Sequence, residues 1–148
     1  MIDEASAQAL LGSWWYNYDE GNFAALKELL TDDVRFTCRT DTGATDYEDF
    51  VRADVSGRDG VIAWNTRHRH GSPYPLRHNA TNVHLVEHRG SEASFVSYIF
   101  VTHILEGAPA NLSTAIVRGD IRQEADSLRV AALHVVLDTR TSVPFTER

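Results

Sequence analysis

Two side chains of this sequence have the types needed to move a proton together, although they lie far apart in the chain. Asp19 follows an aromatic-rich stretch and precedes a glycine, and His78 stands shortly before a long alternating segment. A carboxylate beside an imidazole fixes the tautomer of the ring and raises its basicity, which suits the ring to act as a general base. Each residue also has a simpler interpretation: Asp19 could be a surface acid before a turn, and His78 a loop histidine.

Tyr18 and His103 are two further candidates for proton chemistry. Tyr18 directly precedes Asp19, so the two side chains leave the same part of the chain. His103 lies in the apolar run Phe100–Ile104, and this favours burial. A buried histidine is more often a hydrogen-bonded core residue than a catalyst, and the same holds for His84 and His134.

The aromatic stretch forms the end of a predicted helix over residues 5–18. Apolar residues recur in it at helical spacing, and they are Leu10, Leu11, Trp14, Trp15 and Tyr18. Trp14 and Tyr18 share one face, while Trp15 lies one turn before Asp19. Gly21 is the expected end of the helix, and Asn22 is the expected N-cap of a second helix over residues 23–30. Asp19 is therefore expected at the end of a helix, where a carboxylate is mildly disfavoured by the helix dipole.

After the second helix and one short strand the chain is irregular or helical up to about residue 80, and beyond it apolar and polar residues alternate as in strands. Residues 34–38 predict a short strand, residues 39–57 a polar loop with a short helical piece near 47–53, and residues 57–64 a third helix. Residues 67–75 predict a loop, because Gly71 and two prolines interrupt them. Four strands follow, over residues 81–88, 93–105, 112–123 and 128–138.

Helices followed by a run of strands predict an α+β fold. We expect a cone-shaped α+β barrel, in which the N-terminal helices pack on a strongly curved mixed or antiparallel sheet and enclose a pocket. A chain of 148 residues is long enough for one domain with a full hydrophobic core, so residues 1–148 are expected to form a single domain. Such a pocket suits a small apolar ligand.

Composition argues against several classes of protein. The formal net charge is −7, which argues against a nucleic-acid partner, because phosphate binding needs a basic surface. One cysteine allows no internal disulfide. The N-terminus has no basic segment followed by an apolar core, and no apolar run approaches a membrane span. We therefore expect a cytoplasmic protein with no membrane partner.

Metal and nucleophile motifs are not evident in the sequence. The pair His68 and His70 offers His-x-His, but the arginines beside these histidines would repel a cation. The motifs His-Glu-x-x-His, Gly-x-Ser-x-Gly and a phosphate-binding glycine loop do not occur. We expect neither a metal nor a cofactor, and Cys38 is expected to be a packing residue.

With Tyr18 and Asp19 ending the first helix and His78 opening the strand region, the chain resembles the SnoaL-like branch of the NTF2-like superfamily. The pattern is most similar to those of scytalone dehydratase and the lindane dehydrochlorinase type of lyase. In both, an aspartate at the end of the first helix orients a histidine that removes a substrate proton, and Asp19 and His78 match these positions. Tyr18 and His103 match the tyrosine and the second histidine of scytalone dehydratase. The Ser and Asn of that enzyme fall near Ile116 and Arg118 and are not reproduced.

The resemblance implies a cofactor-independent lyase or isomerase acting on a small hydrophobic, cyclic, aromatic or steroid-like molecule. His78 would be the general base, Asp19 would hold it, and Tyr18 and His103 would polarise a carbonyl or assist a departing hydroxyl. The expected pocket residues are Trp14, Trp15, Phe36, Asn82, Phe100 and Arg118. Two alternatives stay open: a non-catalytic small-ligand-binding or assembly module of the same fold, and a polyketide cyclase. The resemblance also implies a homodimer or homotrimer.

Overall fold

The computed structural model describes all residues, 1–148, and its first helix carries the aromatic stretch toward the sheet. Helix α1 spans Glu4–Asp19 and begins with a capping box, in which the Asp3 side chain accepts from the Ser6 backbone N–H and Ser6 accepts from Asp3. Gly21 follows with φ +70°, a conformation that favours glycine, so the chain turns there as predicted. The turn leaves Asp19 as the last residue of the helix.

Three short helices and two strands connect α1 to the long strands. They are α2 (Phe23–Glu28), β1 (Leu30–Thr40), α3 (Glu48–Val51), β2 (Ala53–Ser56) and α4 (Arg58–His70). Asn22 is the N-cap residue of α2, as the sequence predicted, although its side chain makes no cap hydrogen bond. Helix α4 continues to His70 and ends at Gly71, whereas the sequence predicted a loop from residue 67.

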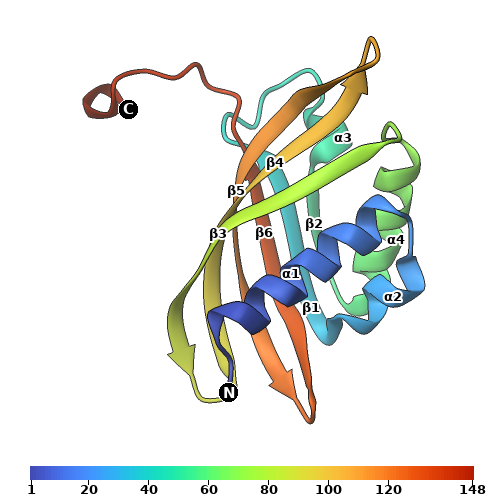
Figure 1. Ribbon diagram of the computed structural model, residues 1–148, viewed down its shortest axis with the longest axis vertical. Coiled ribbons are helices and arrows are strands. Elements are labelled where there is room, and N and C mark those ends of the chain that lie inside the picture. Colours follow the sequence, from blue (N-terminus) through green and yellow to red (C-terminus); the bar gives the residue numbers. More distant parts are fainter.

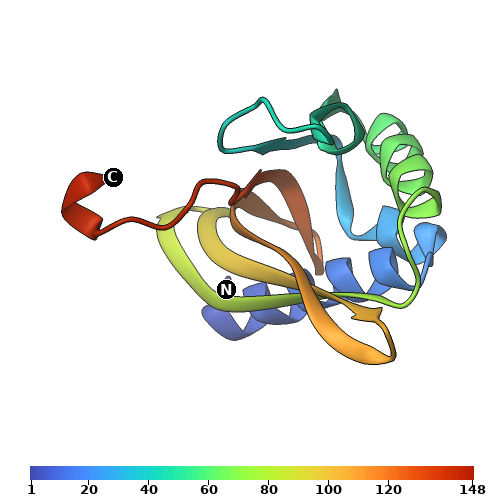
Figure 2. The same ribbon diagram turned by 90° about the horizontal axis from the view of Figure 1, so that it is seen from above.

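A six-stranded mixed sheet forms the rest of the structure and confirms the predicted α+β class. Its last four strands are β3 (Leu76–Arg89), β4 (Glu92–Leu105), β5 (Ala108–Glu124) and β6 (Ser127–Leu137). The strand order is β2-β1-β6-β5-β4-β3, and only the β1–β6 pair is parallel. The sheet is strongly curved and not closed, and α1 crosses its concave side (Figures 1 and 2).

The curvature comes from irregular pairing and from one glycine. Register shifts interrupt β3 against β4, β4 against β5, and β5 against β6, and such bulges bend strands. At Gly119 a Cβ atom would lie 2.0 Å from the carbonyl oxygen of Ala132 and 2.9 Å from the Phe95 ring. Only glycine allows the two strands and the aromatic ring to approach this closely.

The core fills the space between α1 and the concave side of the sheet. Alternate residues of β4 are buried there, and they are Ala93, Phe95, Ser97, Ile99 and Val101. Trp14 and Leu11 of α1 are completely buried against this layer. Beyond β6 the chain runs away from the sheet and ends in the 3-10 turn η1 (Phe145–Glu147), as Figure 1 shows. No helix in the structure is long and apolar enough to cross a membrane.

Candidate active site

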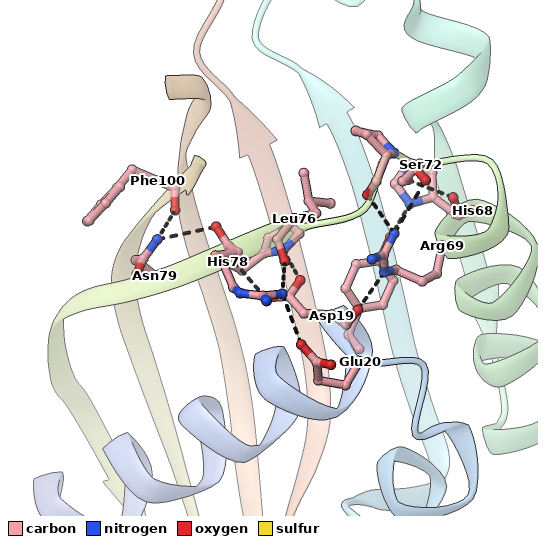
Figure 3. A network of polar contacts seen from close by, with 12 residues as sticks. Asp19, Glu20, His68, Arg69, Ser72, Leu76, His78, Asn79 and Phe100 are labelled. Carbon is pink, nitrogen blue, oxygen red and sulfur yellow. Dashed lines mark hydrogen bonds and ion pairs between the residues drawn. The ribbon is translucent and has the colours of Figure 1, made fainter. Parts of the chain in front are cut away.

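Asp19 and His78 are in direct contact where the end of α1 meets the start of β3. Oδ1 of Asp19 lies 2.6 Å from Nδ1 of His78, and Oδ2 accepts the backbone N–H of the same residue at 2.7 Å. The Asp19 residue is only 5% exposed and the His78 side chain 12%. Two bonds from one carboxylate to one residue fix both the position and the rotation of the imidazole. The sequence prediction that these two residues lie together agrees with this geometry (Figure 3).

The aspartate contact determines which nitrogen of His78 is free. An ionised carboxylate only accepts, so Nδ1 of the imidazole carries the donated proton and Nε2 of the neutral ring keeps its lone pair. Nε2 has no hydrogen-bond partner within the chain. The Trp15 ring stacks on the imidazole at 4.6 Å with an interplanar angle of 4°, which prevents tilting. His78 thus presents a free basic nitrogen in a fixed orientation.

Arg69 holds the backbone that carries Asp19. This arginine of α4 is 6% exposed, and its Nε donates to the backbone carbonyl of Asp19 at 2.9 Å. Its Nη1 donates to the carbonyl of Pro73 at 3.0 Å. A cation at the C-terminal end of α1 offsets the negative end of the helix dipole, which otherwise disfavours a carboxylate there. Arg69 also ties the end of α1 to the segment that leads into β3 (Figure 3).

A cavity of about 460 Å³ opens in front of His78. Fourteen of its 21 lining residues are hydrophobic, and the lining contains no Asp, Glu, Lys or Arg. Trp15 and Phe36 line it, as the sequence predicted, together with residues of α3, α4, β3, β4 and β6. A volume of this size is typical of a small-molecule site. The polar groups that reach the lining include Asn65, Ser72, Ser113 and three histidines.

Tyr18 lines the same cavity and is paired with a residue that the sequence analysis did not select. Its hydroxyl oxygen lies 2.5 Å from Nδ1 of His68 in α4. Tyr18 is 2% exposed, and this burial raises the pKa of its hydroxyl, so Tyr18 stays protonated at neutral pH. Its ring meets the His78 ring edge to face, with the centroids 5.3 Å apart. Tyr18 therefore brings a neutral hydroxyl into the cavity that His78 also lines.

His68 is held as a neutral imidazole. Its ring stacks on Trp64 at 4.6 Å and lies 4.5 Å from the Phe50 ring. Burial, with smaller electrostatic contributions from His78 and Arg69, lowers the pKa of His68 from 6.5 to about 4. His78 and His68 therefore differ in their surroundings: a carboxylate contacts His78, whereas two aromatic rings cover His68.

His103 lines the cavity from β4 but does not join the Asp19–His78 pair. It lies opposite Leu76, whereas Val101 lies opposite His78, so His103 is two residues further along β4. No side-chain hydrogen bond holds it within the chain. His84 and His134 do not line the cavity: His84 bonds Glu4 on the surface, and His134 lies 2.7 Å from the Thr37 hydroxyl.

Four predicted pocket residues do not line this cavity. Trp14 is completely buried against Phe36 because it leaves α1 on the core side. Phe100 and Arg118 occupy strand positions next to inward-facing residues, so both point to the opposite face of the sheet. Asn82 lines a separate depression of about 290 Å³ between α1 and β3. These placements were wrong, and strand alternation explains two of them.

No group of three or more His, Cys, Asp or Glu side chains in the structure is arranged to hold a metal ion.

The SnoaL-like domain family matches residues 1–134, and the chain belongs to this family. The matched residues include Asp19, His78 and most of the cavity lining. A comparison with curated proteins found no significant match.

Solved structures share the fold at low sequence identity. An NTF2-like protein with a cystatin-like fold from Novosphingobium aromaticivorans is 18% identical, with a TM-score of 0.73 over 91% of this chain and 81% of the other. A protein from Streptomyces avermitilis, proposed to be a dehydratase of the NTF2-like family, is 14% identical, with a TM-score of 0.70 over 90% and 94%. The beta subunit of benzoate 1,2-dioxygenase from Burkholderia mallei is 20% identical, with a TM-score of 0.71 over 93% and 91%.

Proposed function

We propose that this protein is a cofactor-independent lyase or isomerase that acts on a small, uncharged, hydrophobic cyclic molecule by acid–base catalysis. The observation that carries the proposal is the Asp19–His78 contact of 2.6 Å, which leaves Nε2 of His78 free at the wall of an apolar cavity. A general base needs this combination of a fixed tautomer, a free lone pair and restricted access of water. Asp19 is then the residue that orients the base.

The reaction begins with removal of a proton from a carbon next to a carbonyl group. Nε2 of His78 takes the proton, the C–H electron pair forms a carbon–carbon double bond, and the carbonyl electron pair moves onto oxygen. In a β,γ-unsaturated ketone, the resulting dienolate takes the proton back at the γ-carbon, which shifts the double bond into conjugation. In a β-hydroxy ketone, the enolate expels the hydroxyl group. In the second case the proton held by His78 leaves with the hydroxyl as water. General base catalysis of such a step contributes about 10²–10⁴-fold.

The chemistry of the cavity supports an uncharged substrate. Its lining has no charged side chain, so a carboxylate or ammonium group would be desolvated there without a partner. The fold similarity to the Streptomyces avermitilis protein proposed to be a dehydratase agrees with this class of reaction. His103 is a candidate for assisting a departing hydroxyl at the far end of the cavity. A polyketide cyclase would use the same groups on a different substrate.

Deuterium exchange tests the proposal without knowledge of the natural substrate. Uncharged cyclic ketones, beginning with 1-tetralone, are incubated with the protein in D₂O, and exchange of the α-hydrogens is followed by NMR. The wild-type protein should accelerate exchange, and His78→Ala should lower the rate by roughly 10²-fold or more. Asp19→Asn should also lower it, while His84→Ala should not, because His84 is 64% exposed and bonds only Glu4. Folded His78→Ala and Asp19→Asn variants that keep the full rate would refute the mechanism.

A second candidate function is a non-catalytic module that binds a small ligand or another subunit. The fold similarity to the beta subunit of benzoate 1,2-dioxygenase favours this candidate. It predicts that ligands fill the cavity without exchange of their α-hydrogens. The homodimer or homotrimer expected from the resemblance stays a prediction, and sedimentation or light scattering tests it.

A further inference from the structure

His68 is a cavity residue that the Asp19–His78 pair does not need, and its surroundings are unusual for a histidine. Trp64 and Phe50 cover its ring, and its Nδ1 lies 2.5 Å from the Tyr18 hydroxyl. Its other nitrogen, Nε2, is buried and has no hydrogen-bond partner. Two aromatic neighbours would be sufficient for packing alone. The close contact with a buried tyrosine needs a separate explanation.

Tyr18 and His68 can share their protons in two ways. A neutral imidazole carries one proton, and the tyrosine hydroxyl carries another. If Tyr18 donates to Nδ1, the Tyr18 proton is already engaged in a hydrogen bond with His68. His68 must then bury an Nε2–H group without an acceptor. If instead Nδ1–H of His68 donates to the Tyr18 oxygen, the buried Nε2 keeps only an unpaired lone pair, and the Tyr18 O–H needs an acceptor that the cavity can supply. Buried N–H groups without an acceptor are rare, and unpaired acceptors are somewhat less rare. The second arrangement is the one that the contacts favour.

The Tyr18 ring lies beside the ring of the proposed base, and the two side chains line one cavity. The two rings meet edge to face with centroids 5.3 Å apart. In a ketone, the carbonyl oxygen and the α-hydrogen are also close neighbours, because they are attached to adjacent carbons. One substrate can therefore place its oxygen at Tyr18 and its α-hydrogen at His78.

We infer that His68 is a positioning residue whose Nδ1–H group holds the Tyr18 oxygen, so that Tyr18 donates its own proton to the oxygen of an uncharged ketone whose α-hydrogen faces His78. The inference rests on the proposed function for the role of His78. The carbonyl substrate with an α-hydrogen already belongs to that proposed function. The inference adds that His68 holds Tyr18 as the donor that stabilises the enolate oxygen. Tyr18 stays protonated throughout the reaction and stabilises the enolate through a hydrogen bond. His68 neither gains nor loses a proton.

The first part of the experiment reads the tautomer directly. The wild-type protein is labelled with ¹⁵N-histidine, and His68 is assigned by comparison with His68→Asn. Long-range ¹H–¹⁵N spectra at pH 7 should show the proton of His68 on Nδ1. A proton on Nε2 would overturn the inference, because the Tyr18 proton would then be directed at His68. This measurement needs no turnover, so it does not depend on the proposed function.

The second part compares two replacements of His68, of which only one keeps an N–H donor. The amide nitrogen of asparagine occupies nearly the place of Nδ1, so His68→Asn keeps an N–H donor for the Tyr18 oxygen, whereas His68→Leu removes it. The probes are 1-tetralone for exchange and 1-naphthol, an aromatic mimic of its enolate, for binding. His68→Leu should lower the exchange rate constant about tenfold or more with little change in KM, and should weaken 1-naphthol binding about tenfold. His68→Asn should recover most of both losses.

Failure of this inference differs from failure of the proposed function. If His68→Leu and His68→Asn lose equal activity and affinity while both are folded, His68 acts by packing and the positioning role is refuted. If His78→Ala keeps full exchange, the proposed base is wrong, whereas the tautomer of His68 and the 1-naphthol affinities still decide whether His68 positions Tyr18. A Tyr18→Phe variant that binds 1-naphthol as tightly as the wild type would also contradict the inference.

Discussion

Because His68 is buried as a neutral imidazole, we predict that acid lowers the free energy of unfolding of the protein. Replacing His68 by phenylalanine should remove this part of the pH dependence. The pKa of His68 is lowered from 6.5 to about 4, mainly by burial. Below pH 6.5 the unfolded chain takes up a proton that the folded protein refuses, so the free energy of unfolding falls as the pH falls from 6.5 toward 4. The contribution of His68 is complete above pH 6.5 and is lost through this window.

The size of the effect follows from the two pKa values. Each pKa unit corresponds to about 1.4 kcal/mol, so the full difference is about 3–4 kcal/mol, and the part between pH 7.5 and 4.5 is about 2–3 kcal/mol. His68→Phe removes the titrating group but keeps an aromatic ring between Trp64 and Phe50. The loss of the Tyr18 contact in this variant adds an offset that does not depend on His68 titration.

Urea denaturation of both proteins at several pH values between 7.5 and 4.5 measures the effect. Carboxyl groups whose pKa is lowered in the folded state, such as Asp33 and Asp41, contribute equally to both proteins and cancel in the comparison. We expect the wild type to lose about 2–3 kcal/mol more than the variant over this range. If the difference between the two proteins is the same at every pH, His68 titrates normally and the argument for its neutral burial is refuted.

Further predictions concern a thiol and two glycines. Burial raises the pKa of the Cys38 thiol to about 12, so iodoacetamide should modify the folded protein far more slowly than the urea-unfolded chain at pH 8, and equal rates would contradict its burial. Gly119→Ala places a Cβ 2.0 Å from the Ala132 carbonyl oxygen, so it should destabilise the protein by about 1–3 kcal/mol or prevent folding. The control Gly12→Ala meets no atom within 4 Å inside a helix and should stabilise by about 0.5–1 kcal/mol; equal effects of the two on the urea midpoint would contradict the close strand approach.

Local sequence patterns were sufficient for the elements that position the base. The apolar spacing of residues 5–18 and the glycine at position 21 predict where α1 ends, and this places Asp19 at its last position. Strand alternation predicts that His103 shares a face with Ile99 and Val101, and all three line the cavity. The same alternation places Phe100 on the other face, so the sequence itself contained the information against Phe100 as a pocket residue.

His68 was missed because the segment around it gives conflicting signals. Gly71 and the following prolines predict a loop, yet the helix continues to His70 and uses Gly71 only as its C-cap. The spacing of Trp64 and His68, four residues apart, is the helical signal that could have identified the stacked pair. The contact with Tyr18 is a tertiary contact between α1 and α4, and no local pattern encodes it.

The claim that Asp19 and His78 act as one unit is tested most directly by deuterium exchange of 1-tetralone in the two single variants and in the double variant Asp19→Asn/His78→Ala. If Asp19 acts only through the imidazole that it holds, removing it matters only while His78 is present. We predict that the double variant exchanges at a rate within about twofold of His78→Ala alone. A double variant whose loss equals the product of the two single losses would contradict the account.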